Sequence, residues 1–567
     1  MKLLQKLLPF VILIGLSYWA IKPLLLPGFF PMHDDAQVAR VYEMHKSLSD
    51  GMFPVRWVSD LGYGYGYPIF NFYAPLAYYL GGLMAFFFDA LTATKIMMII
   101  AIIGSGITMY LFAKSFWGRW GGLVSALLYV YVPYHAVNIY VRGDVTEFFA
   151  YSFIPLAFWG VSQIAQTLHN KKTTKKTLWK WIAVSAIGYA GIIISHNLTA
   201  MMATPFLFAF ACLLVFQVKT AERYLIFASL GLGILLASFY WLPVFAEMKY
   251  TDVLSQVGGG AAYKEHFVCP QQLWNSAWGF GGSTPNSCID GVSYKIGKLH
   301  IGLAIIALFA LFFSWKKDKR LFSILSFCVL SLSFSLFLML NSSQFLWDAL
   351  SPMAFFQYPW RFLLIVSFFI SFLGGAVLWM FKNFPFVEPL LGSVLLIAII
   401  FVNAELFVPQ VQLAKTANDY TKPSIIKWDT SKISDEYLPN GFAESKSIRE
   451  IVVDKITLPS SDGKITVIQQ TGMITAQIFL KKAKKILIKQ AYFPAWHVFV
   501  DGKETSYTKA KNGMIVAVPV GTHFIELRFI QTPIERLGNA LSLTGVLVLF
   551  LGIMSTRKDK IHDKKST

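Results

Sequence analysis

The sequence predicts a polytopic α-helical membrane protein of about twelve spans, with an extracytoplasmic antiparallel β-sandwich domain near its C-terminus. First, 55% of the 567 residues are hydrophobic and only 14% are charged, whereas about a quarter of a soluble domain is charged. Second, apolar runs of about 18 to 22 residues, each long enough to cross roughly 30 Å of hydrocarbon, recur between short charged joints. Third, several stretches between residues 465 and 529 alternate as strands do.

The formal net charge of +19 indicates topology rather than nucleic-acid binding. Its lysines and arginines lie mainly in the joints between apolar runs and not on one amphipathic face. Because such joints mark cytoplasmic ends, we expect a plasma-membrane protein with both termini in the cytoplasm. The basic clusters are Lys114 with Arg119, Lys171 to Lys180, Lys219 with Arg223, Lys316 to Arg320 and Arg557 to Lys565.

The apolar stretch from residue 7 to residue 26 resembles a signal peptide, but no small-residue cleavage site follows it, so we interpret it as an uncleaved first span. The segment Pro75 to Phe88, about 14 residues long, is too short to cross and predicts an interfacial or re-entrant helix. The predicted spans are residues 7–26, 93–113, 119–134, 147–168, 181–198, 199–218, 224–245, 299–314, 321–340, 362–381, 389–407 and 537–554.

Three regions follow from this threading. Residues 1–407 form a transmembrane domain whose first outer loop covers residues 29–92. Residues 408–536 form the outer β-sandwich, in which Asp501-Gly502 and Asn512-Gly513 are typical hairpin turns. Residues 537–567 form a final transmembrane helix and a basic cytoplasmic tail.

Paired carboxylates in the first outer loop are the strongest candidates for chemistry. Asp34 and Asp35 follow the first span directly, where they could bind a divalent cation such as Mg or Mn, or act as a general base toward a hydroxyl group. An equally weighted alternative is that they only cap a helix beginning at Ala36. Further binding candidates in this loop are His33, Arg56 and, in a Gly-Tyr run that could offer a flat surface to sugars, Tyr65 and Tyr67.

Ionisable residues also occur at three later outer joints. Arg142, Asp144 and Glu147 lie at the mouth of a span, where they either line a polar cavity or follow from the helix dipole alone. His196-Asn197 interrupts an apolar sequence at the outer turn between two spans. The imidazole lies either near the same face as the first loop or, as an ordinary turn histidine, at the lipid headgroups. Arg361 begins a span, where it could pair with a lipid phosphate or act as an ordinary interfacial anchor.

Four cysteines are too few for a disulfide framework. Cys212 and Cys328 lie inside apolar runs and are expected to be inert. Cys269 and Cys288 share one polar loop, and we expect them to form a disulfide if that loop faces an oxidising compartment. The chain contains no G-x-G-x-x-G, Walker, H-E-x-x-H or C-x-x-C signature.

On these residues, the chain resembles the membrane family labelled 6-pyruvoyl-tetrahydropterin synthase-related, which in turn is similar to the GT-C superfamily of polyprenyl-phosphate-sugar-dependent glycosyltransferases. A three-histidine zinc cluster of the pterin type is absent. The C-terminal region resembles the outer β-domain of YfhO-type membrane proteins. The matching stretches are Asp34 to Leu80, Arg142 to Glu147, Ser195 to Leu198, Phe356 to Arg361, Tyr492 to Lys503 and Val518 to His523.

The resemblance implies a membrane glycosyltransferase that moves a sugar from a polyprenyl-phosphate-linked donor to an extracytoplasmic glycan or lipid acceptor of the cell envelope. Asp34 or Asp35 would be the base, while Arg56, His196 or Arg361 would hold the phosphate. Two other hypotheses remain: a transporter or flippase of lipid-linked glycans, and a non-catalytic envelope scaffold. The charges lie mainly at span ends, which disfavours a transport pathway.

Overall fold

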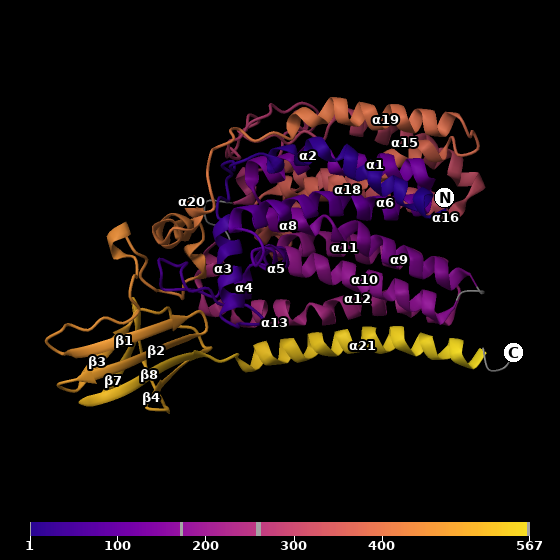
Figure 1. Cartoon of the computed structure of the whole chain (residues 1–567). Coiled ribbons are helices and arrows are strands. Elements are labelled where there is room, and N and C mark those ends of the chain that lie inside the picture. The colour runs from indigo at the N-terminus through magenta and orange to yellow at the C-terminus, as the bar shows by residue number, and fades with distance from the viewer. Residues whose placement is uncertain (1, 171–173, 257–261, 564–567) are drawn as a thin grey trace.

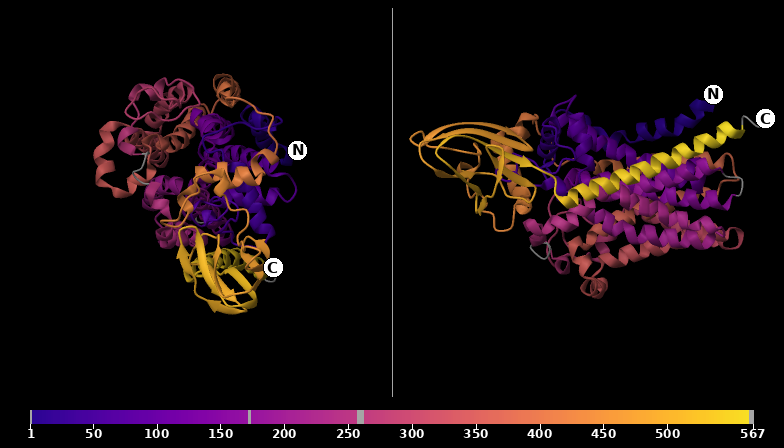
Figure 2. Two further views of the ribbon diagram at one scale, coloured as in Figure 1. Left: turned by 90° about the vertical axis from the view of Figure 1, so that its left-hand side faces the viewer. Right: turned by 90° about the horizontal axis from the view of Figure 1, so that it is seen from below.

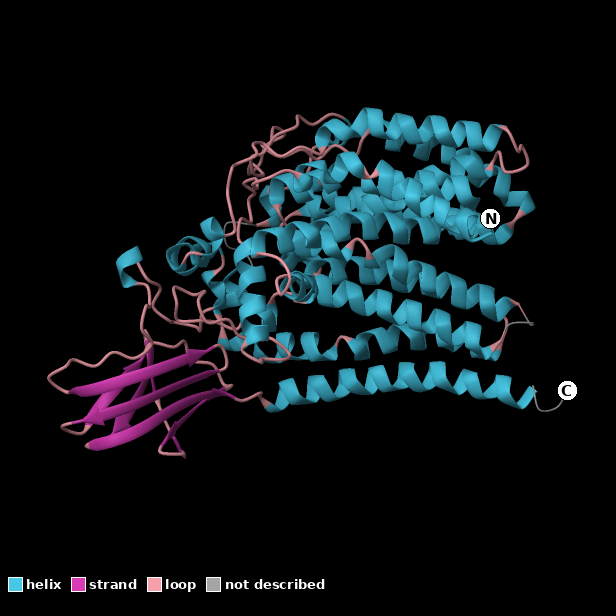
Figure 3. Cartoon of the chain, viewed as in Figure 1, coloured by secondary structure: helices cyan, strands magenta, loops and turns pink. Residues whose placement is uncertain are grey.

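The computed structural model describes residues 2–170, 174–256 and 262–563. The expected basic positions 171, 172, 564 and 565 lie outside the described residues. Figure 1 shows a bundle of long helices with the strands beyond one end and both chain termini at the other end. Figure 3 shows the same division by secondary structure: the bundle consists of helices, and the strands gather beyond one end of it. The chain is a multi-pass membrane protein.

Nine described helices are long and apolar enough to cross a membrane, or up to eleven if each of two bent helix pairs counts as one span. The bent pairs are Gln5–Leu16 with Tyr18–Leu25, at 55°, and Ala221–Leu236 with Ser238–Tyr250, at 65°. The expected twelve spans exceed this count by one, because residues 93–113 and 119–134 are counted together as one helical run, α6 (Ala90–Val130). The short apolar segment forms α5 (Leu76–Met84), which is nine residues long.

The run α6 turns back on itself at Gly118. This glycine has φ 76° and ψ −171°, a conformation that costs glycine little and other residues much. A Cβ atom on Gly122 would lie 3.0 Å from the Cα atom of Lys114, although that many residues of straight helix rise about 12 Å. The two arms therefore lie side by side, and they correspond to the two spans predicted from the sequence.

The helix α18 is buried along almost its whole length, because it packs against α6, α15 and α16. The long helices other than α6 are α1 (Lys2–Leu16), α2 (Tyr18–Leu25), α3 (Gln37–Ser49), α9 (Phe153–His169), α10 (Lys175–Ser195), α11 (Asn197–Gln217), α12 (Leu225–Leu236), α13 (Ser238–Glu247), α15 (Lys298–Lys317), α16 (Lys319–Met339), α18 (Leu363–Trp379), α19 (Val387–Asn403) and α21 (Pro533–Asp563).

Short helices lie mainly at the end of the bundle that bears the strands. They are α4 (Ile69–Phe72), α7 (Pro133–Val137), α8 (Val145–Ala150), α14 (Pro270–Trp274), α17 (Gln344–Ala349) and α20 (Asn418–Thr421), with the π-helices η1 (Asn138–Arg142) and η10 (Ile425–Thr430). The 3₁₀ helices are η2 (Ala221–Tyr224), η3 (Met248–Tyr250), η4 (Asp252–Gln256), η5 (Tyr263–Glu265), η6 (Asn341–Ser343), η7 (Ser351–Phe356), η8 (Pro359–Phe362), η9 (Ala404–Leu406), η11 (Ser431–Ile433), η12 (Asp435–Tyr437) and η13 (Ile448–Glu450).

The last helix, α21, packs on the bundle through glycines at every seventh residue. A Cβ atom on Gly538 would meet the carbonyl oxygen of Ser238 at 2.7 Å, and one on Gly545 would meet the backbone nitrogen of Leu236 at 3.2 Å. Gly552 faces the ring of Trp179 in the same way. Small residues let helices approach closely in a membrane, so α21 lies directly against α12 and α13. Figure 2 shows this last helix, in yellow, along the outside of the bundle.

The strands form two antiparallel sheets, with orders β1-β2-β8-β4-β5 and β3-β7-β6. Buried residues alternate along them, for example Ile474, Ala476, Ile478 and Leu480 in β2, which is the expected period of two. Asp501-Gly502, with φ 50° and 77°, forms the predicted turn between β4 and β5. The strands are β1 (Gly463–Gln470), β2 (Met473–Leu480), β3 (Lys484–Ile488), β4 (Trp496–Val500), β5 (Lys503–Thr505), β6 (Thr508–Ala510), β7 (Gly513–Val518) and β8 (Gly521–Phe529).

Residues 408–462 differ from the rest of the expected β-domain. They contain short helices and isolated bridges but none of the named strands. This segment packs on the first loop: Leu413 pairs with Phe29, and the backbone N–H of Val452 donates to the carbonyl oxygen of Tyr63 at 2.9 Å. The strands therefore occupy only residues 463–529, because the preceding chain is used to cover the first loop.

Candidate functional site

Five polar residues share one face where α6 is followed by α7, η1 and α8. Tyr134, Asn138 and Arg142 are spaced four apart, as are Glu147 and Tyr151, so each set lies on one side of its helical segment. The carboxylate of Glu147 is fully buried and accepts from the hydroxyls of Tyr134 at 2.8 Å and Tyr151 at 2.9 Å, and from the amide of Asn138 at 3.1 Å. Glu147 is thus held in one position.

Arg142 joins this face to Asp144. Its Nη1 donates to Glu147 Oε2 and its Nη2 to Asp144 Oδ2, both at 3.0 Å. Asp144 also caps α8, because its Oδ1 accepts the backbone N–H of Glu147 at 3.1 Å. Asp144 therefore caps a helix and at the same time pairs with Arg142.

His196 completes a group of potential metal ligands. It forms the link between α10 and α11, its Nδ1 lies 2.8 Å from the hydroxyl of Thr199, and its Nε2 lies 3.9 Å from Asp144 Oδ2. One ligand atom each from Asp144, Glu147 and His196 lie within 4.8 Å of one another. Two carboxylates and an imidazole suit divalent cations such as Mn or Zn, so the donor set fits a cation. We call Arg142 and these three residues the outer cluster.

Electrostatic interactions favour the protonation states in which Asp144 and His196 can bind a cation. Both residues lie in links between spans. Burial opposes ionisation of Asp144, but interactions with His196, Arg142 and Arg361 outweigh it and lower the pKa of that carboxyl. Burial lowers the pKa of His196, against the opposing charge of Asp144. A carboxylate beside a neutral imidazole is the protonation state that cation binding requires.

The first loop brings Asp34 to the outer cluster. The backbone N–H of His33 donates to the carbonyl oxygen of Val141 at 3.0 Å, and that of Asp34 to the carbonyl oxygen of Arg142 at 2.9 Å. Asp34 Oδ2 accepts from Gln37 Nε2 at 2.8 Å and from Arg40 Nη1 at 3.0 Å. The residue that caps α3 is Ala36, without a side-chain bond, so neither acid has the capping role that sequence left open.

Tyr73 links the two acids Asp34 and Asp144. Its hydroxyl donates to Asp34 Oδ2 at 3.5 Å and lies 3.3 Å from Thr146 Oγ1. Thr146 in turn donates to Asp144 Oδ1 at 3.0 Å. The guanidinium of Arg40 lies over the Tyr73 ring, 4.5 Å from its centre, and this cation–π contact helps to hold the ring in place.

We expect the Gly143→Ala variant to separate the first loop from the outer cluster. Gly143 has φ 70°, and an added Cβ atom would lie 2.1 Å from Met32 Sδ. Both the backbone strain and the contact disfavour alanine. The expected result is a loss of roughly 2 kcal/mol or more, which lowers the thermal midpoint of a chain of this size by at least about 2 °C, measured against Gly441→Ala. Gly441 also has a positive φ but no neighbour within 4 Å of its Cβ position, so equal losses in the two variants would contradict the role of the Met32 contact.

Aromatic rings cover Arg142 on the side away from Glu147. The ring centre of Trp360 lies 4.8 Å from the Arg142 guanidinium carbon, and Tyr294 stacks on Trp360 at 5.7 Å. The loop that carries Tyr294 contains a disulfide between Cys269 and Cys288, with a Cα–Cα distance of 5.6 Å.

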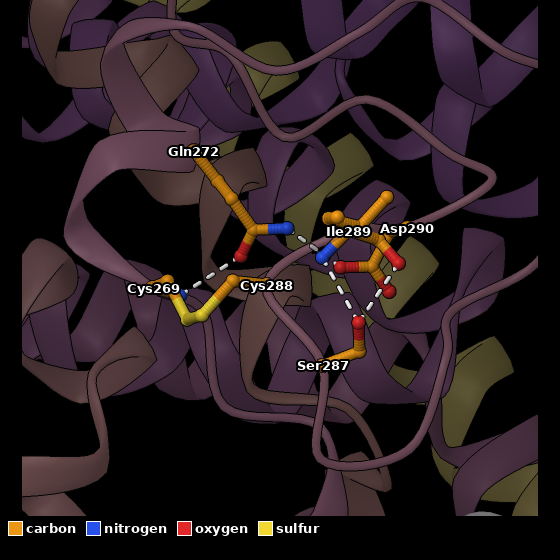
Figure 4. The surroundings of a disulfide bond; sticks show 6 residues. All are labelled: Cys269, Gln272, Ser287, Cys288, Ile289 and Asp290. Carbon is orange, nitrogen blue, oxygen red and sulfur yellow. Dashed lines mark hydrogen bonds between the residues drawn. A yellow bond between two sulfur atoms is a disulfide. The ribbon is translucent and has the colours of Figure 1, made fainter.

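Figure 4 shows how this disulfide loop is held. Gln272 bridges its two ends, since its Oε1 accepts the backbone N–H of Cys269 at 2.9 Å and its Nε2 donates to Asp290 Oδ2 at 2.6 Å. Asp290 also accepts from the hydroxyl of Tyr294 at 3.4 Å. The disulfide thereby helps to fix the ring that covers Arg142.

Arg361 lies at the same place, in η8 at the start of α18. Its charge acts on both Asp144 and His196, and its guanidinium carbon lies 5.5 Å from the ring centre of Tyr358. Its Nε and Nη1 atoms are buried and have no hydrogen-bond partner among the described residues. Buried guanidinium donors are costly without an acceptor, so these two are available to an anion.

Other residues singled out in the sequence lie apart from the outer cluster. Asp35 is half-buried near Lys415 and Tyr420 and makes no ion pair among the described residues; burial raises its pKa, and Lys415 opposes the shift. Tyr65 and Tyr67 are buried against residues 408–462, where Tyr65 contacts the ring of Phe442 at 5.0 Å.

His33 and Asn197 are engaged with backbone. His33 Nε2 lies 2.9 Å from the carbonyl oxygen of Phe280, in the disulfide loop. Asn197 donates to the carbonyl oxygen of Phe72 at 3.1 Å and accepts from the hydroxyl of Tyr240. Both side chains therefore fix segments next to the outer cluster.

Arg56 is buried beneath the sheets rather than beside a phosphate site. Its Nη1 donates to Asn71 at 2.7 Å, its Nη2 donates to Asn539 at 3.1 Å, and its Nε lies 3.6 Å from Glu535 Oε1. Arg56 and Glu535 are 2% and 0% exposed. The first loop, α13 and α21 meet here, because Glu247 of α13 accepts from Asn71 and from Thr532.

Sequence reasoning missed Arg40, Tyr73, Tyr134, Asn138 and Tyr151. The spacing of four between Tyr134, Asn138 and Arg142, and again between Glu147 and Tyr151, is a signal that could have found three of them. Arg40 and Tyr73 have no such signal, because their contact with Asp34 depends on how the first loop folds.

Comparisons with known proteins find distant similarities. An uncharacterized protein of Lactococcus lactis subsp. cremoris (strain MG1363) is 24% identical over 254 residues, which cover 42% of this chain and 40% of that protein. The oligosaccharyltransferase of Archaeoglobus fulgidus in its apo form is similar to the structure with a TM-score of 0.39 and 13% identity, over 80% of this chain and 62% of that one. The same enzyme, AglB, with an inhibitory peptide and a dolichol-phosphate gives a TM-score of 0.36 and 12% identity, over 71% and 56%.

The chain thus spans less than two thirds of each of these proteins. A family model matches a defined part of the sequence, from the end of the first loop to η4. The matched part contains Arg142, Asp144, Glu147 and His196. Residues 70–258 match the membrane-protein family described as 6-pyruvoyl-tetrahydropterin synthase related domain, which confirms the family resemblance seen in the sequence.

Proposed function

We propose that this chain is a GT-C-like membrane glycosyltransferase that moves a sugar from a polyprenyl-phosphate-linked donor to an extracytoplasmic acceptor of the cell envelope. The observation that carries the proposal is the convergence, at one end of the bundle, of Asp144, Glu147 and His196 with Arg142, Arg361 and the first-loop acid Asp34. These groups combine potential cation ligands with donors for a phosphate.

The basic side chains supply the phosphate site. In glycosyl transfer from a lipid phosphate, negative charge develops on the phosphate as it leaves, and fixed positive groups stabilise that charge. Arg142 is already paired with Asp144 and Glu147. Arg361 retains two buried nitrogen donors without partners among the described residues, so we assign the donor phosphate to Arg361.

Asp144 and His196 would hold a divalent cation, with Glu147 beside them. When bound, such a cation polarises phosphoryl oxygens as a Lewis acid. The protein's own contribution is to keep the Asp144 carboxylate ionised and to fix the imidazole of His196 through Thr199. Asp34 contributes a further negative charge at the acceptor side, held by Gln37 and Arg40.

The end of the bundle that bears the outer cluster is assigned to the outside of the membrane. The disulfide loop lies at this end, and disulfides persist in oxidising compartments. Both termini lie at the opposite end, as Figure 1 shows, which agrees with cytoplasmic termini. The donor lipid would then reach the outer cluster from the outer leaflet, and residues 408–536 would lie beside the acceptor.

The adjacent acids Asp34 and Asp35 give a matched test. Asp34→Asn is expected to lower sugar transfer at least about 100-fold, because it removes the carboxylate that faces Arg40 and Tyr73. Asp35→Asn, which changes the neighbouring side chain outside the outer cluster, is expected to stay within about threefold of the wild type. The assay follows a labelled sugar from a panel of polyprenyl-phosphate hexoses into cell-envelope acceptor, with the protein in nanodiscs.

Two results of this assay oppose the proposal. Wild-type protein that transfers no sugar from any member of the panel contradicts glycosyl transfer itself. Equal activity of Asp34→Asn and wild type, in protein of equal thermal stability, contradicts the assignment of the site to this end of the bundle.

A further inference from the structure

The short segment Ser431–Tyr437, which lies beyond the transmembrane bundle in sequence, is fixed on the first loop by the residues on both sides of Glu436. Ser431 Oγ accepts the backbone N–H of Tyr63 at 3.1 Å, and Ser434 Oγ lies 3.1 Å from the hydroxyl of Tyr67. Asp435 accepts from the hydroxyl of Tyr63 at 2.8 Å. We call this segment the anchor segment.

Tyr437 extends the anchor segment to the acid Asp34. Its ring lies 5.7 Å from that of Tyr67 and 6.5 Å from that of Tyr73. Tyr73 in turn contacts Asp34 through its hydroxyl and Arg40 through its ring face. Because its neighbours Asp435 and Tyr437 are both held on the first loop, Glu436 is confined to the same place.

The side chain of Glu436 is half-buried, and among the described residues no hydrogen bond or ion pair ties it to another side chain. It interacts electrostatically with Arg40 and Asp34 from the first loop, with Asp435 from its own segment, and with the hydroxyls of Tyr67 and Tyr437. The side chain of Arg40 is only 3% exposed, and its Nε atom also has no hydrogen-bond partner among the described residues. Glu436 therefore has no side-chain partner, although its carboxylate accepts its own backbone N–H, and Arg40 has one buried nitrogen without a partner among the described residues. Both residues interact electrostatically with Asp34.

We propose that Glu436 is the base of the transfer reaction and that the acceptor hydroxyl binds between the anchor segment and the first loop. This inference rests on the proposed function and adds to it a catalytic residue from outside the transmembrane bundle. Asp34 itself is poorly placed to act as the base, because Arg40 and Gln37 already donate to its Oδ2 atom. Glu436 has no such partner.

The step balances with these groups alone. The acceptor oxygen forms a bond to the anomeric carbon of the sugar while the bond from that carbon to the phosphate oxygen breaks. The phosphate leaves with the electron pair of the broken bond, next to Arg361, and the acceptor proton passes to the carboxylate of Glu436. Arg40 donates to the acceptor oxygen or to Asp34, which keeps both in place.

Titration supports the assignment. Burial, together with the charges of Asp435 and Asp34, raises the pKa of Glu436 to about 7, against the opposing effects of its own backbone N–H and of Arg40. A base is most effective when its pKa is near the working pH. Because Glu436 accepts a proton only when ionised, transfer should rise with pH through about 7 and then level off.

The test compares Glu436→Gln, Glu436→Asp and Asp429→Asn in the full-length protein. Asp429 is an exposed acid near the anchor segment that pairs only with Lys432 at 3.4 Å, and its variant should retain wild-type transfer. Glu436→Gln is expected to lower kcat roughly 100-fold or more, with unchanged affinity for polyprenyl phosphate and without the rise in rate through neutral pH. Glu436→Asp should recover part of kcat and the pH dependence.

The outcomes separate this inference from the proposed function. Wild-type kcat and an unchanged pH profile in Glu436→Gln, alongside an inactive Asp34→Asn, would remove Glu436 and leave the glycosyltransferase proposal intact. A loss of kcat in Glu436→Gln that keeps the wild-type pH profile would show that the side chain acts structurally and would also overturn the inference.

Discussion

Replacing Asp144 by asparagine should reduce sugar transfer at least about 1,000-fold while the protein still folds. Asparagine keeps the size and the N-cap acceptor of the side chain, but it removes the charge that faces both Arg142 and His196. It also removes one ligand of the only group of three potential metal ligands found among the described residues. Transfer assays in nanodiscs with graded Mn or Mg concentrations would measure the effect.

The control for Asp144→Asn is Glu405→Gln, which neutralises an exposed acid at the end of α19, away from the outer cluster. This control should transfer at the wild-type rate. His196→Gln should lose activity together with Asp144→Asn, and the double variant should be no worse than either single one, because the two side chains act on one site. Additive losses would show that Asp144 and His196 do not share a ligand.

Arg56→Ala is expected to give the largest loss of stability, about 3 to 5 kcal/mol, because it leaves Glu535 buried without its opposite charge. Glu535 is 0% exposed, and Arg56 is the basic residue within ion-pair distance of it. The variant also frees acceptors on Asn71 and Asn539. Thermal unfolding in detergent, compared with the exposed neighbour variant Arg536→Ala, would report the difference.

A second variant separates charge from packing at this position. Arg56→Met combined with Glu535→Leu removes both charges and keeps most of the volume, so it should recover a large part of the stability lost in Arg56→Ala. If the double variant is as unstable as Arg56→Ala, the uncompensated charge is not the cause. In both variants Asp34 and Asp144 are unchanged, so any folded protein should retain transfer activity.

The sequence predicted the membrane class and most helices because hydrophobic runs of span length have few alternatives. It also predicted alternation in the strands and the turn at Asp501-Gly502. It also predicted two spans where α6 has two arms, and the structure places the reversal between them at Gly118. It did not predict that residues 408–462 leave the β-domain to cover the first loop.

For the site, the sequence named the members of the outer cluster but could not rank them. Arg142, Asp144, Glu147, His196 and Arg361 meet because three separate stretches of the chain reach the same end of the bundle. Two adjacent acids, by contrast, look alike in sequence although only one faces the outer cluster. The direction of each side chain is set by hydrogen bonds of the folded loop, which no local pattern contains.

The glycines of α21 have a consequence for the sheets that precede it. Sliding this helix by about one turn, or roughly 5.4 Å, would bring Ile534, Leu541 and Val548 to the places where Gly538, Gly545 and Gly552 now touch α13, α12 and Trp179. Those side chains do not fit there, so the helix has a single depth of insertion. Because only a few residues separate α21 from β8, this depth sets the height of the sheets above the lipid and keeps the anchor segment level with the first loop.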